Sequence, residues 1–462
     1  MGWSAILAWA HSRNTVLVAA ALMVGLAGSL RLMRRKPQDV YKRGALLHDG
    51  RRLQRRCARL KRANSELLTL AGIAIAARDE TKHFKLIGAT GSGKTTAIRE
   101  LLAAVIARGD RVVLADPDAG YLARFYDRYR GDVILNPFEK NSVKWDLFAE
   151  IRNSYDIEQL ASGLIPAGND PSAAEWRSYA RTFLSAVVRR CYSAGPRDMA
   201  SLWRLLTMAS ADELRIIIAG TPAQPFLDPD NARMFGSIRS VTASAIAAFE
   251  YIQRQRATSF SVRAWVRDRT LPGILFIPYK ADQIAALRSM IAAWMRLAIF
   301  EAMSQAEDRD QRLWFMVDEL DALGQIDGLK DALARLRKFG GRCVLGFQSV
   351  AQVSSTYGQG DAHTLVENCG NTLILRCAGS ESGGTSQFAS RLIGDREIVR
   401  CQISRGRDRE AALSTRGARR SRSITEQHAM EPAVMPSELE QLPDLCGYLK
   451  TASSPGWLKV TF

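Results

Sequence analysis

The stretch GATGSGKT, residues 88–95, has the residue types and spacing of a loop that binds nucleotide phosphates. In the pattern G-x-x-x-x-G-K-[ST], the glycines let backbone N–H groups point at the phosphates, the lysine reaches the β and γ oxygens, and the hydroxyl holds Mg²⁺. We therefore predict ATP and Mg²⁺ as ligands of this chain. The residues expected at the nucleotide are Gly88, Ala89, Thr90, Gly91, Ser92, Gly93, Lys94, Thr95 and Thr96.

The surroundings of the loop favour this interpretation. The apolar run from Phe84 to Ile87 predicts a short buried strand before the loop, and Ile98, Leu101 and Val105 recur at helical spacing after it. A plain glycine turn between a strand and a helix is the alternative. The strand–loop–helix context makes that alternative the weaker one.

An acidic pair supplies the second half of a nucleotide site. Leu313 to Val317 is an apolar run of strand length, and Asp318 and Glu319 follow at its carboxyl end. We expect Asp318, together with Thr95, to hold Mg²⁺, and Glu319 to polarise the attacking water. An Asp-Glu pair after a strand is also a common helix N-cap, but the phosphate loop favours the catalytic interpretation.

Two more predicted strands end in polar residues. Asp116 follows the apolar run from Val112 to Leu114, and Gln348 follows the run from Cys343 to Leu345. Open α/β sheets bind ligands at the carboxyl edge of their parallel strands, so Gln348 could sense the γ-phosphate there. Gln348 could instead only begin a helix, and Asp116, which precedes Pro117, could only mark a turn.

The order of these segments predicts an α/β nucleotide-binding domain with an all-α insertion. From about Trp145 to Val266 the predicted elements are helices separated by turns rich in proline, glycine, asparagine and aspartate. The sheet resumes at Ile274–Ile277. We expect a membrane anchor at 1–36, a basic juxtamembrane segment at 37–75, the nucleotide-binding domain at 76–145 and 266–462, and the all-α domain at 146–265.

The amino terminus contains a candidate membrane span. No charged residue occurs from Thr15 to Leu30, and RLMRRK follows directly, as expected of a stop-transfer flank with the positive charges in the cytoplasm. A cleaved signal peptide is the alternative, but it would export an ATPase away from its nucleotide. We therefore predict a single-pass protein of the bacterial inner membrane whose bulk is cytoplasmic. The seven cysteines show no C-x-x-C spacing and are predicted to be reduced.

The net charge of +17 is concentrated in two segments. Residues 31–62 hold thirteen lysines and arginines against two acids, and residues 396–422 hold nine arginines against three acids. Anionic lipid is the simplest partner for the first segment because it lies beside the predicted span. The second is predicted to be a mobile arginine-rich loop, for which contact with nucleic acid and plain solvation are both open.

Several stretches together resemble a known family. GATGSGKT, VDELDAL, RKFGGRCVLGFQS and VMPSELEQLPDLCGYLK occur in the order found in the coupling proteins of conjugative type IV secretion systems. The resemblance extends from about Lys82 to the end of the chain. It implies a RecA-like P-loop domain in a membrane-anchored homo-hexameric ATPase. Such a motor pumps relaxase-bound single-stranded DNA into the secretion channel, so relaxase, relaxosome accessory proteins and channel components are implied partners.

The resemblance also implies an arginine that reaches the nucleotide of a neighbouring subunit, and the matching position is Arg337. We expect it near the nucleotide edge of the sheet, with a plain surface arginine as the alternative and Arg376 as the next candidate. The family usually has two membrane spans, whereas this sequence offers one. A double-stranded DNA translocase of the chromosome-segregation type, a protein-secretion ATPase and a nonenzymatic recruiting scaffold are the competing functions.

Overall fold

The computed structural model describes residues 40–168, 170–270, 272–380, 384–407 and 420–462. The predicted membrane span lies outside these residues. No helix in the described ranges is both long and apolar enough to cross a membrane. The chain forms two compact units: residues 47–393 with 434–462 make the larger one, and residues up to 46 with 394–433 make the smaller one.

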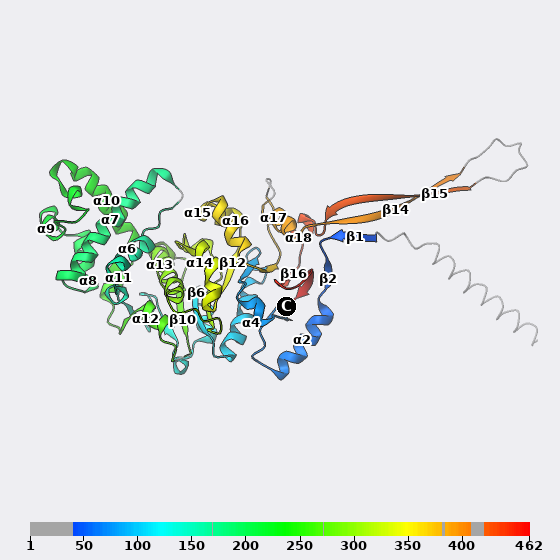
Figure 1. The fold of residues 1–462 in the computed structure, drawn as a ribbon, viewed down its shortest axis with the longest axis horizontal. Helices are drawn as coiled ribbons and strands as arrows, with labels where there is room; N and C mark the ends of the chain where they lie inside the picture. The colour runs from blue at the N-terminus through cyan, green and yellow to red at the C-terminus, as the bar shows by residue number, and fades with distance from the viewer. Residues whose placement is uncertain (1–39, 169, 271, 381–383, 408–419) are drawn as a thin grey trace, which may run out of the picture. The chain divides into compact units, whose positions relative to one another are not determined.

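A mixed sheet is the centre of the larger unit (Figure 1). In spatial order its described strands are β2 (Leu47–Asp49), β17 (Trp457–Thr461), β16 (Cys446–Lys450), β13 (Asn371–Ile374), β5 (Phe84–Ile87), β12 (Gly341–Phe347), β11 (Leu313–Val317), β6 (Arg111–Pro117), β10 (Ile274–Tyr279) and β7 (Val133–Ile134). The strands from β13 to β7 are parallel, and β16 and β17 add an antiparallel edge. The predicted α/β class and each predicted strand are therefore confirmed.

The parallel strands form because their sequences are continuous apolar runs buried on both faces. Every residue of β5, β11 and β12 is buried. On one face, helix α4 (Lys94–Ala107) packs Ile98, Leu101 and Val105 into the same core as strands β5 and β11. Helix α13 (Ile284–Met303), which follows β10, is buried along most of its length. The remaining helices of this part are α3 (Ala77–Glu80), α5 (Leu122–Phe125), α14 (Leu329–Arg335), α15 (Val350–Tyr357), α16 (Gln359–Glu367), α17 (Gly384–Ile393) and α18 (Pro436–Glu440).

The helical insertion is present as predicted. It comprises α6 (Ser154–Leu164), α7 (Pro171–Ala194), α8 (Met199–Thr207), α9 (Ala211–Ile217), α10 (Ala232–Ala245) and α11 (Phe249–Arg254). Its entrance and exit are held together, because β8 (Lys144–Trp145) pairs in parallel with β9 (Ser259–Phe260) just before α12 (Val262–Arg267). The insertion is therefore a closed domain on a two-strand neck.

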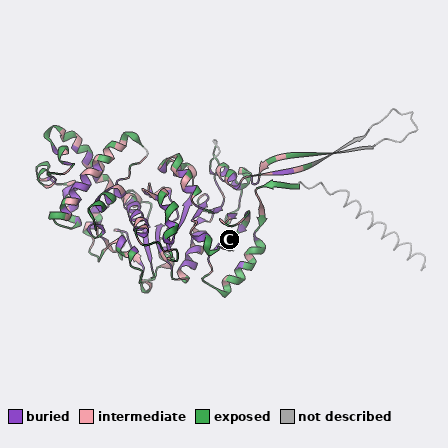
Figure 2. Ribbon diagram, in the orientation of Figure 1, coloured by how far each residue is buried: buried purple, intermediate pink, exposed green. Residues whose placement is uncertain are grey.

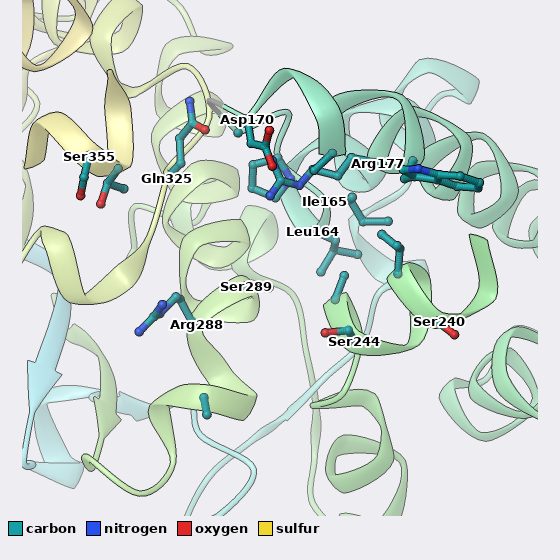
Figure 3. A pocket seen from close by; sticks show the side chains of 18 residues that line it. Leu164, Ile165, Asp170, Arg177, Ser240, Ser244, Arg288, Ser289, Gln325 and Ser355 are labelled. Atoms are coloured by element: carbon teal, nitrogen blue, oxygen red, sulfur yellow. The ribbon is translucent and has the colours of Figure 1, made fainter. Parts of the chain in front are cut away.

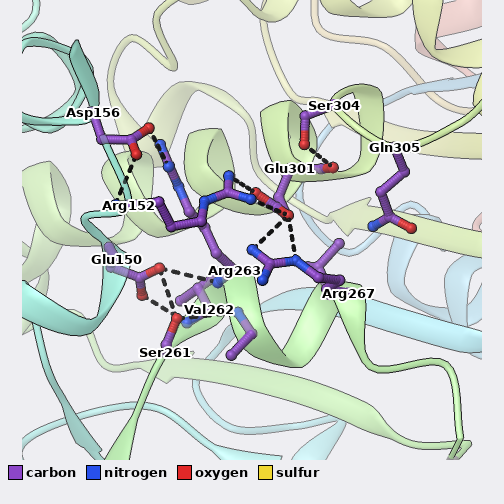
Figure 4. Close-up of polar contacts among 12 residues, drawn as sticks. Glu150, Arg152, Asp156, Ser261, Val262, Arg263, Arg267, Glu301, Ser304 and Gln305 are labelled. Carbon is purple, nitrogen blue, oxygen red and sulfur yellow. Dashed lines mark hydrogen bonds and ion pairs between the residues drawn. The ribbon is translucent and has the colours of Figure 1, made fainter. Parts of the chain in front are cut away.

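Two buried carboxylates hold this neck, and the second of them joins it to the nucleotide-binding domain (Figure 4). Glu150 accepts hydrogen bonds from the indole of Trp145 at 2.9 Å and from the backbone N–H of Val262 at 2.7 Å. Glu301, on α13, accepts from Arg152 at 2.5 Å and from Arg267 at 3.1 Å. The junction between the domains is thus ionic as well as apolar.

The basic segments have regular structure within the described residues. Residues 51–63 form helix α2, and β2 before it pairs with β17, so residues 47–75 belong to the larger unit. The prediction of an arginine-rich loop at 396–422 was wrong for most of its length. Residues Asp395–Arg407 (β14) and Arg420–Pro432 (β15) are paired antiparallel strands, and β1 (Val40–Gly44) pairs with β14. The ladder needs only the backbone donors and acceptors of the two strands, so a low content of apolar residues did not prevent it.

Candidate nucleotide-binding site

The glycine-rich loop connects the carboxyl end of β5 to the first turn of α4. Gly91 and Gly93 have φ values of 75° and 119°, which only glycine adopts without strain. A Cβ atom at Gly88 would lie only 2.6 Å from Ser92 Oγ, so the close approach of the backbone to Ser92 leaves no room for a side chain at residue 88. The loop is anchored from below, because Gly88 N donates to Phe347 O at 3.1 Å and Ala89 N donates to Arg376 O at 2.7 Å.

Lys94 begins α4 and lies beneath the loop. Its ammonium donates to the carbonyl oxygens of Gly88 at 2.7 Å and Ala89 at 3.2 Å. Burial lowers the pKa of this lysine, while the nearby carboxylates of Asp318 and Glu319 oppose that shift. A buried ammonium held by neutral carbonyls is a suitable partner for phosphate oxygens of high charge.

Asp318 is brought to the loop from β11, two strands away. Its Oδ2 atom accepts a hydrogen bond from Thr95 Oγ1 at 2.7 Å, so the two predicted magnesium-binding residues are adjacent. A hydroxyl and a carboxylate are oxygen ligands of the kind that Mg²⁺ prefers when nucleotide phosphates supply the rest of its shell. These side chains therefore fit the predicted metal.

Glu319 and Gln348 meet at the same edge of the sheet. Gln348 Nε2 donates to Glu319 Oε1, and Thr90 Oγ1 donates to Gln348 Oε1 at 3.1 Å. Burial, followed by the charge of Asp318, raises the pKa of Glu319. A carboxylate whose pKa is raised is a better proton acceptor, and the glutamine links it to the phosphate loop.

Asp116 takes a different position from the one expected of a ligand-facing carboxylate. It accepts the backbone N–H groups of Tyr121 at 3.1 Å and Leu122 at 2.7 Å, and so holds the start of α5. Burial raises its pKa to about 6 in spite of these hydrogen bonds. These contacts favour the alternative that Asp116 only marks a turn.

Two tyrosines at the site carried no recognisable signal in the sequence. Tyr121 donates its hydroxyl to Asp318 Oδ2 at 2.8 Å, the oxygen that Thr95 also contacts. Tyr279 ends β10, and its buried hydroxyl has no hydrogen-bond partner among the described residues. Burial and the charges of Glu319 and Asp318 raise the pKa of Tyr279. A tyrosine that ends an apolar run looks like part of the core until the strand order is known.

Arg337 lies at the other edge of the sheet, so the expectation of a place near the nucleotide edge was wrong. It belongs to the 3-10 turn Leu336–Phe339, directly before β12, and its charge acts on His83, which directly precedes β5. The phosphate loop is at the far end of these strands. The seven residues of β12 separate the two edges by about 20 Å.

Arg376 is closer to the loop than Arg337. It follows β13 at the carboxyl edge, where its carbonyl accepts from Ala89 N, and its guanidinium pairs with Asp444 at 2.9 Å. Arg337, in contrast, cannot reach the nucleotide loop of its own chain. A role for Arg337 at a nucleotide therefore requires a second subunit.

A separate cleft of about 1240 Å³ lies between the all-α domain and the nucleotide-binding domain (Figure 3). Arg177 and Asp170, from α7 and its N-cap, line one side, and Arg288 of α13 and Gln325 line the other. The site built around the phosphate loop is elsewhere, at the carboxyl ends of β5 and β11. The cleft is therefore distinct from the candidate catalytic residues.

Comparison with known proteins decides the family. A family model described as the type IV secretion-system coupling protein DNA-binding domain matches residues 67–462. The chain belongs to the type IV secretion coupling proteins. Coupling protein TraD of Escherichia coli strain K12 is 30% identical over 391 residues, which cover 83% of this chain and 52% of TraD. The chain thus spans about half the length of the curated relatives that it matches.

Solved coupling-protein structures have the same fold. Plasmid coupling protein TrwB in complex with the non-hydrolysable ATP analogue ADPNP superposes with a TM-score of 0.78 at 30% identity, over 93% of this chain and 95% of that one. TrwB in complex with ADP and Mg²⁺ superposes with a TM-score of 0.77 at 30% identity, over 92% and 94%. The predicted resemblance to the coupling-protein family is confirmed, as is its RecA-like fold with a helical domain.

Proposed function

We propose that this chain is the coupling ATPase of a conjugative type IV secretion system. It uses ATP hydrolysis to recruit relaxase-bound single-stranded DNA and pump it into the secretion channel. The observation that carries the proposal is the convergence of Lys94, Thr95, Asp318, Glu319 and Gln348 at one sheet edge of a coupling-protein fold. Solved TrwB complexes with ADPNP and with ADP and Mg²⁺ support the choice of ATP and Mg²⁺ as its ligands.

Each side chain has a defined task in this mechanism. The loop from Gly88 to Thr96 binds the phosphates, and Lys94 neutralises charge on the β and γ groups. Thr95 and Asp318 would hold Mg²⁺, which when bound supplies further neutralisation of the phosphates. Glu319 accepts a proton from the attacking water. The oxygen of that water forms a bond to the γ-phosphorus, while the bond between the γ-phosphorus and the oxygen of the β-phosphate breaks. Gln348 senses whether the γ-phosphate is present. Its hydrogen bond to Glu319 makes the position of that carboxylate depend on the γ-phosphate.

The position of Arg337 supports the proposed homo-hexameric assembly. Since this exposed arginine lies about 20 Å from its own phosphate loop, it acts on the nucleotide of the adjacent subunit in a homo-hexamer. Residues 1–36 anchor each subunit in the inner membrane as a single span, and relaxase, relaxosome accessory proteins and channel components are the protein partners.

The test is the ATPase activity of the full chain with and without single-stranded DNA. Turnover should rise with single-stranded DNA, Lys94→Ala should abolish it, and Glu319→Gln should keep ATP bound while hydrolysis stops. A preference for duplex would indicate a double-stranded DNA translocase, and indifference to DNA would indicate a protein-secretion ATPase. If the unmodified hexamer does not hydrolyse ATP at all, the result would favour a nonenzymatic recruiting scaffold.

A further inference from the structure

Helix α2, Arg51–Ala63, presents a face of arginines that its own fold leaves unneutralised. Arg51, Arg52, Arg55, Arg56, Arg59 and Arg62 are all exposed, and the helix contains no acidic residue. Lys61 lies 3.9 Å from Glu100, but none of the six arginines is within ion-pair distance of a carboxylate in the described part of the chain. Figure 2 shows most of α2 in the colour of exposed residues.

The arginines share one side of the helix. At 3.6 residues per turn they fall within an arc of about 140°. The other side is seated on the protein, because Cys57 is buried and Gln54 donates to the carbonyl oxygens of Ala71 at 2.7 Å and Thr461 at 2.8 Å. The orientation of α2 is therefore fixed, with its charge directed outward.

This arrangement opposes the formation of the helix. Arg51 and Arg55, Arg52 and Arg56, and Arg55 and Arg59 are like charges four residues apart, which repel each other on a helix surface. Arg51 and Arg52 also stand at the amino terminus, where the helix dipole disfavours positive charge. A polyanionic partner would remove both penalties at once.

We propose that this arginine face of α2 docks on the phosphate headgroups of anionic membrane lipid. Leu53 and Leu60 border the arginines and are 39% and 51% exposed, so they can enter the acyl boundary while the guanidinium groups bind phosphates. The inference rests on the membrane anchor proposed above, whose uncharged run ends about 20 residues before α2.

Nucleic acid is the other polyanion, and two observations disfavour it here. The matched DNA-binding domain begins at residue 67, after α2 has ended at Ala63. The helix also has no aromatic side chain on which a base could stack, whereas its exposed leucines have no partner in a phosphate backbone. The observations therefore favour a lipid surface.

The experiment places an environment-sensitive fluorophore at Leu60→Cys in the full chain, with Cys401 and Cys446 replaced by serine. The other cysteines are buried. The protein is inserted into nanodiscs of phosphatidylcholine alone or with added phosphatidylglycerol. We expect a blue shift and quenching by lipid-borne quenchers only in the anionic discs, reversed by high salt. Replacing Arg55, Arg56 and Arg59 by glutamine should lower the ratio of lipid-docked to free α2 about a hundredfold, because each arginine contributes a factor of about five.

The matched control replaces the exposed Arg128, Arg233 and Arg256 by glutamine, which should leave the signal unchanged. Identical spectra in neutral and anionic discs would overturn the proposal, as would equal losses in the two triple variants. A shift caused by a single-stranded oligonucleotide in neutral discs would instead assign the face to nucleic acid. A chain that never enters the discs would contradict the anchor, whereas a chain that enters with an unchanged probe contradicts only the docking of α2.

Discussion

A single carboxylate oxygen links the phosphate loop to the neighbouring strands. Asp318 Oδ2 accepts from Thr95 and from Tyr121, and Tyr121 is itself held by the contact of its backbone with Asp116. This chain of hydrogen bonds fixes the rotamer of Asp318 before any ligand is bound. Tyr121 is thus a positioning residue for Asp318, the carboxylate proposed to hold Mg²⁺.

Tyr121→Phe should raise the Mg²⁺ concentration needed for half-maximal ATPase activity by about tenfold or more, as loss of an outer-shell contact does. Activity at saturating Mg²⁺ should recover most of its original value, because Phe keeps the packing. The measurement is a Mg²⁺ titration of turnover. Tyr126→Phe, at a partly exposed tyrosine five residues on, is the matched control. A titration that does not move in Tyr121→Phe would mean that Asp318 is held without the tyrosine.

His83 makes the stability of the sheet sensitive to acid. Its Nδ1 accepts from Cys343 N at 3.1 Å, so Nε2 carries the proton and donates to Leu333 O at 2.9 Å. Burial lowers the pKa of His83 to about 4. Because the folded pKa lies below the unfolded value, the contribution of the neutral imidazole is present at neutral pH and is lost as the pH falls from about 6.5 to about 4.

We therefore expect the free energy of unfolding to fall by about 1.4 kcal/mol per pH unit across that window from this residue alone. His83→Asn should flatten this part of the pH dependence, and asparagine tolerates the φ of 55° at this position. Denaturant unfolding at several pH values tests it, with the exposed His363→Asn as control. The same slope in His83→Asn would show that other groups cause the acid sensitivity.

At the scale of elements, a buried carboxylate joins the neck of the all-α domain to the nucleotide-binding domain. Arg152 at the start of the insertion and Arg267 in α12 both pair with Glu301, which is 2% exposed. The carboxylate would be costly to bury without these partners. This joint between the two domains is thus stable only while both arginines remain beside Glu301.

Glu301→Gln should destabilise the protein by about 2 kcal/mol, because hydrogen bonds to a charged group are exchanged for weaker ones. It should also increase protease cleavage in the neck. Glu250→Gln, which removes an exposed pair with Arg254 on α11, should cost less than about 0.5 kcal/mol. The readouts are denaturant unfolding and limited proteolysis. Equal effects of the two substitutions would mean that the joint depends on packing and not on its charges.

At the scale of the whole molecule, the distance between Arg337 and its own phosphate loop makes the proposed ATPase dependent on assembly. Arg337→Ala should bind ATP normally but hydrolyse it ~10³-fold more slowly, as expected for loss of an arginine finger. Mixing it with Lys94→Ala subunits should restore some turnover where an intact loop meets an intact arginine.

The neighbouring exposed Arg335→Ala is the control and should keep the unmodified rate. The measurement is ATP turnover under conditions where the hexamer forms. If Arg337→Ala hydrolyses ATP at the wild-type rate in that assembly, Arg337 does not act on the nucleotide of the adjacent subunit. Arg376, beside the loop and paired with Asp444, would then be the residue to test.

The local parts of the candidate site could be predicted from the sequence. A phosphate loop needs its glycines, lysine and hydroxyl at fixed spacing, and buried parallel strands need uninterrupted apolar runs, so Lys94, Thr95, Asp318 and Glu319 could be located without coordinates. The coupling-protein family was likewise recognisable, because the order of several short motifs is more specific than any one of them.

Tertiary structure alone decided which distant side chains complete these motifs. Tyr121 reaches Asp318 only because β6 lies next to β11, a strand order that local sequence does not encode. Arg337 was expected at the wrong edge because the chain must return to the opposite end of the sheet before β12 can run parallel to β5. The arginine-rich segment became a hairpin because two polar strands satisfied each other's backbone hydrogen bonds, a pairing between residues up to 37 positions apart that no local pattern reports.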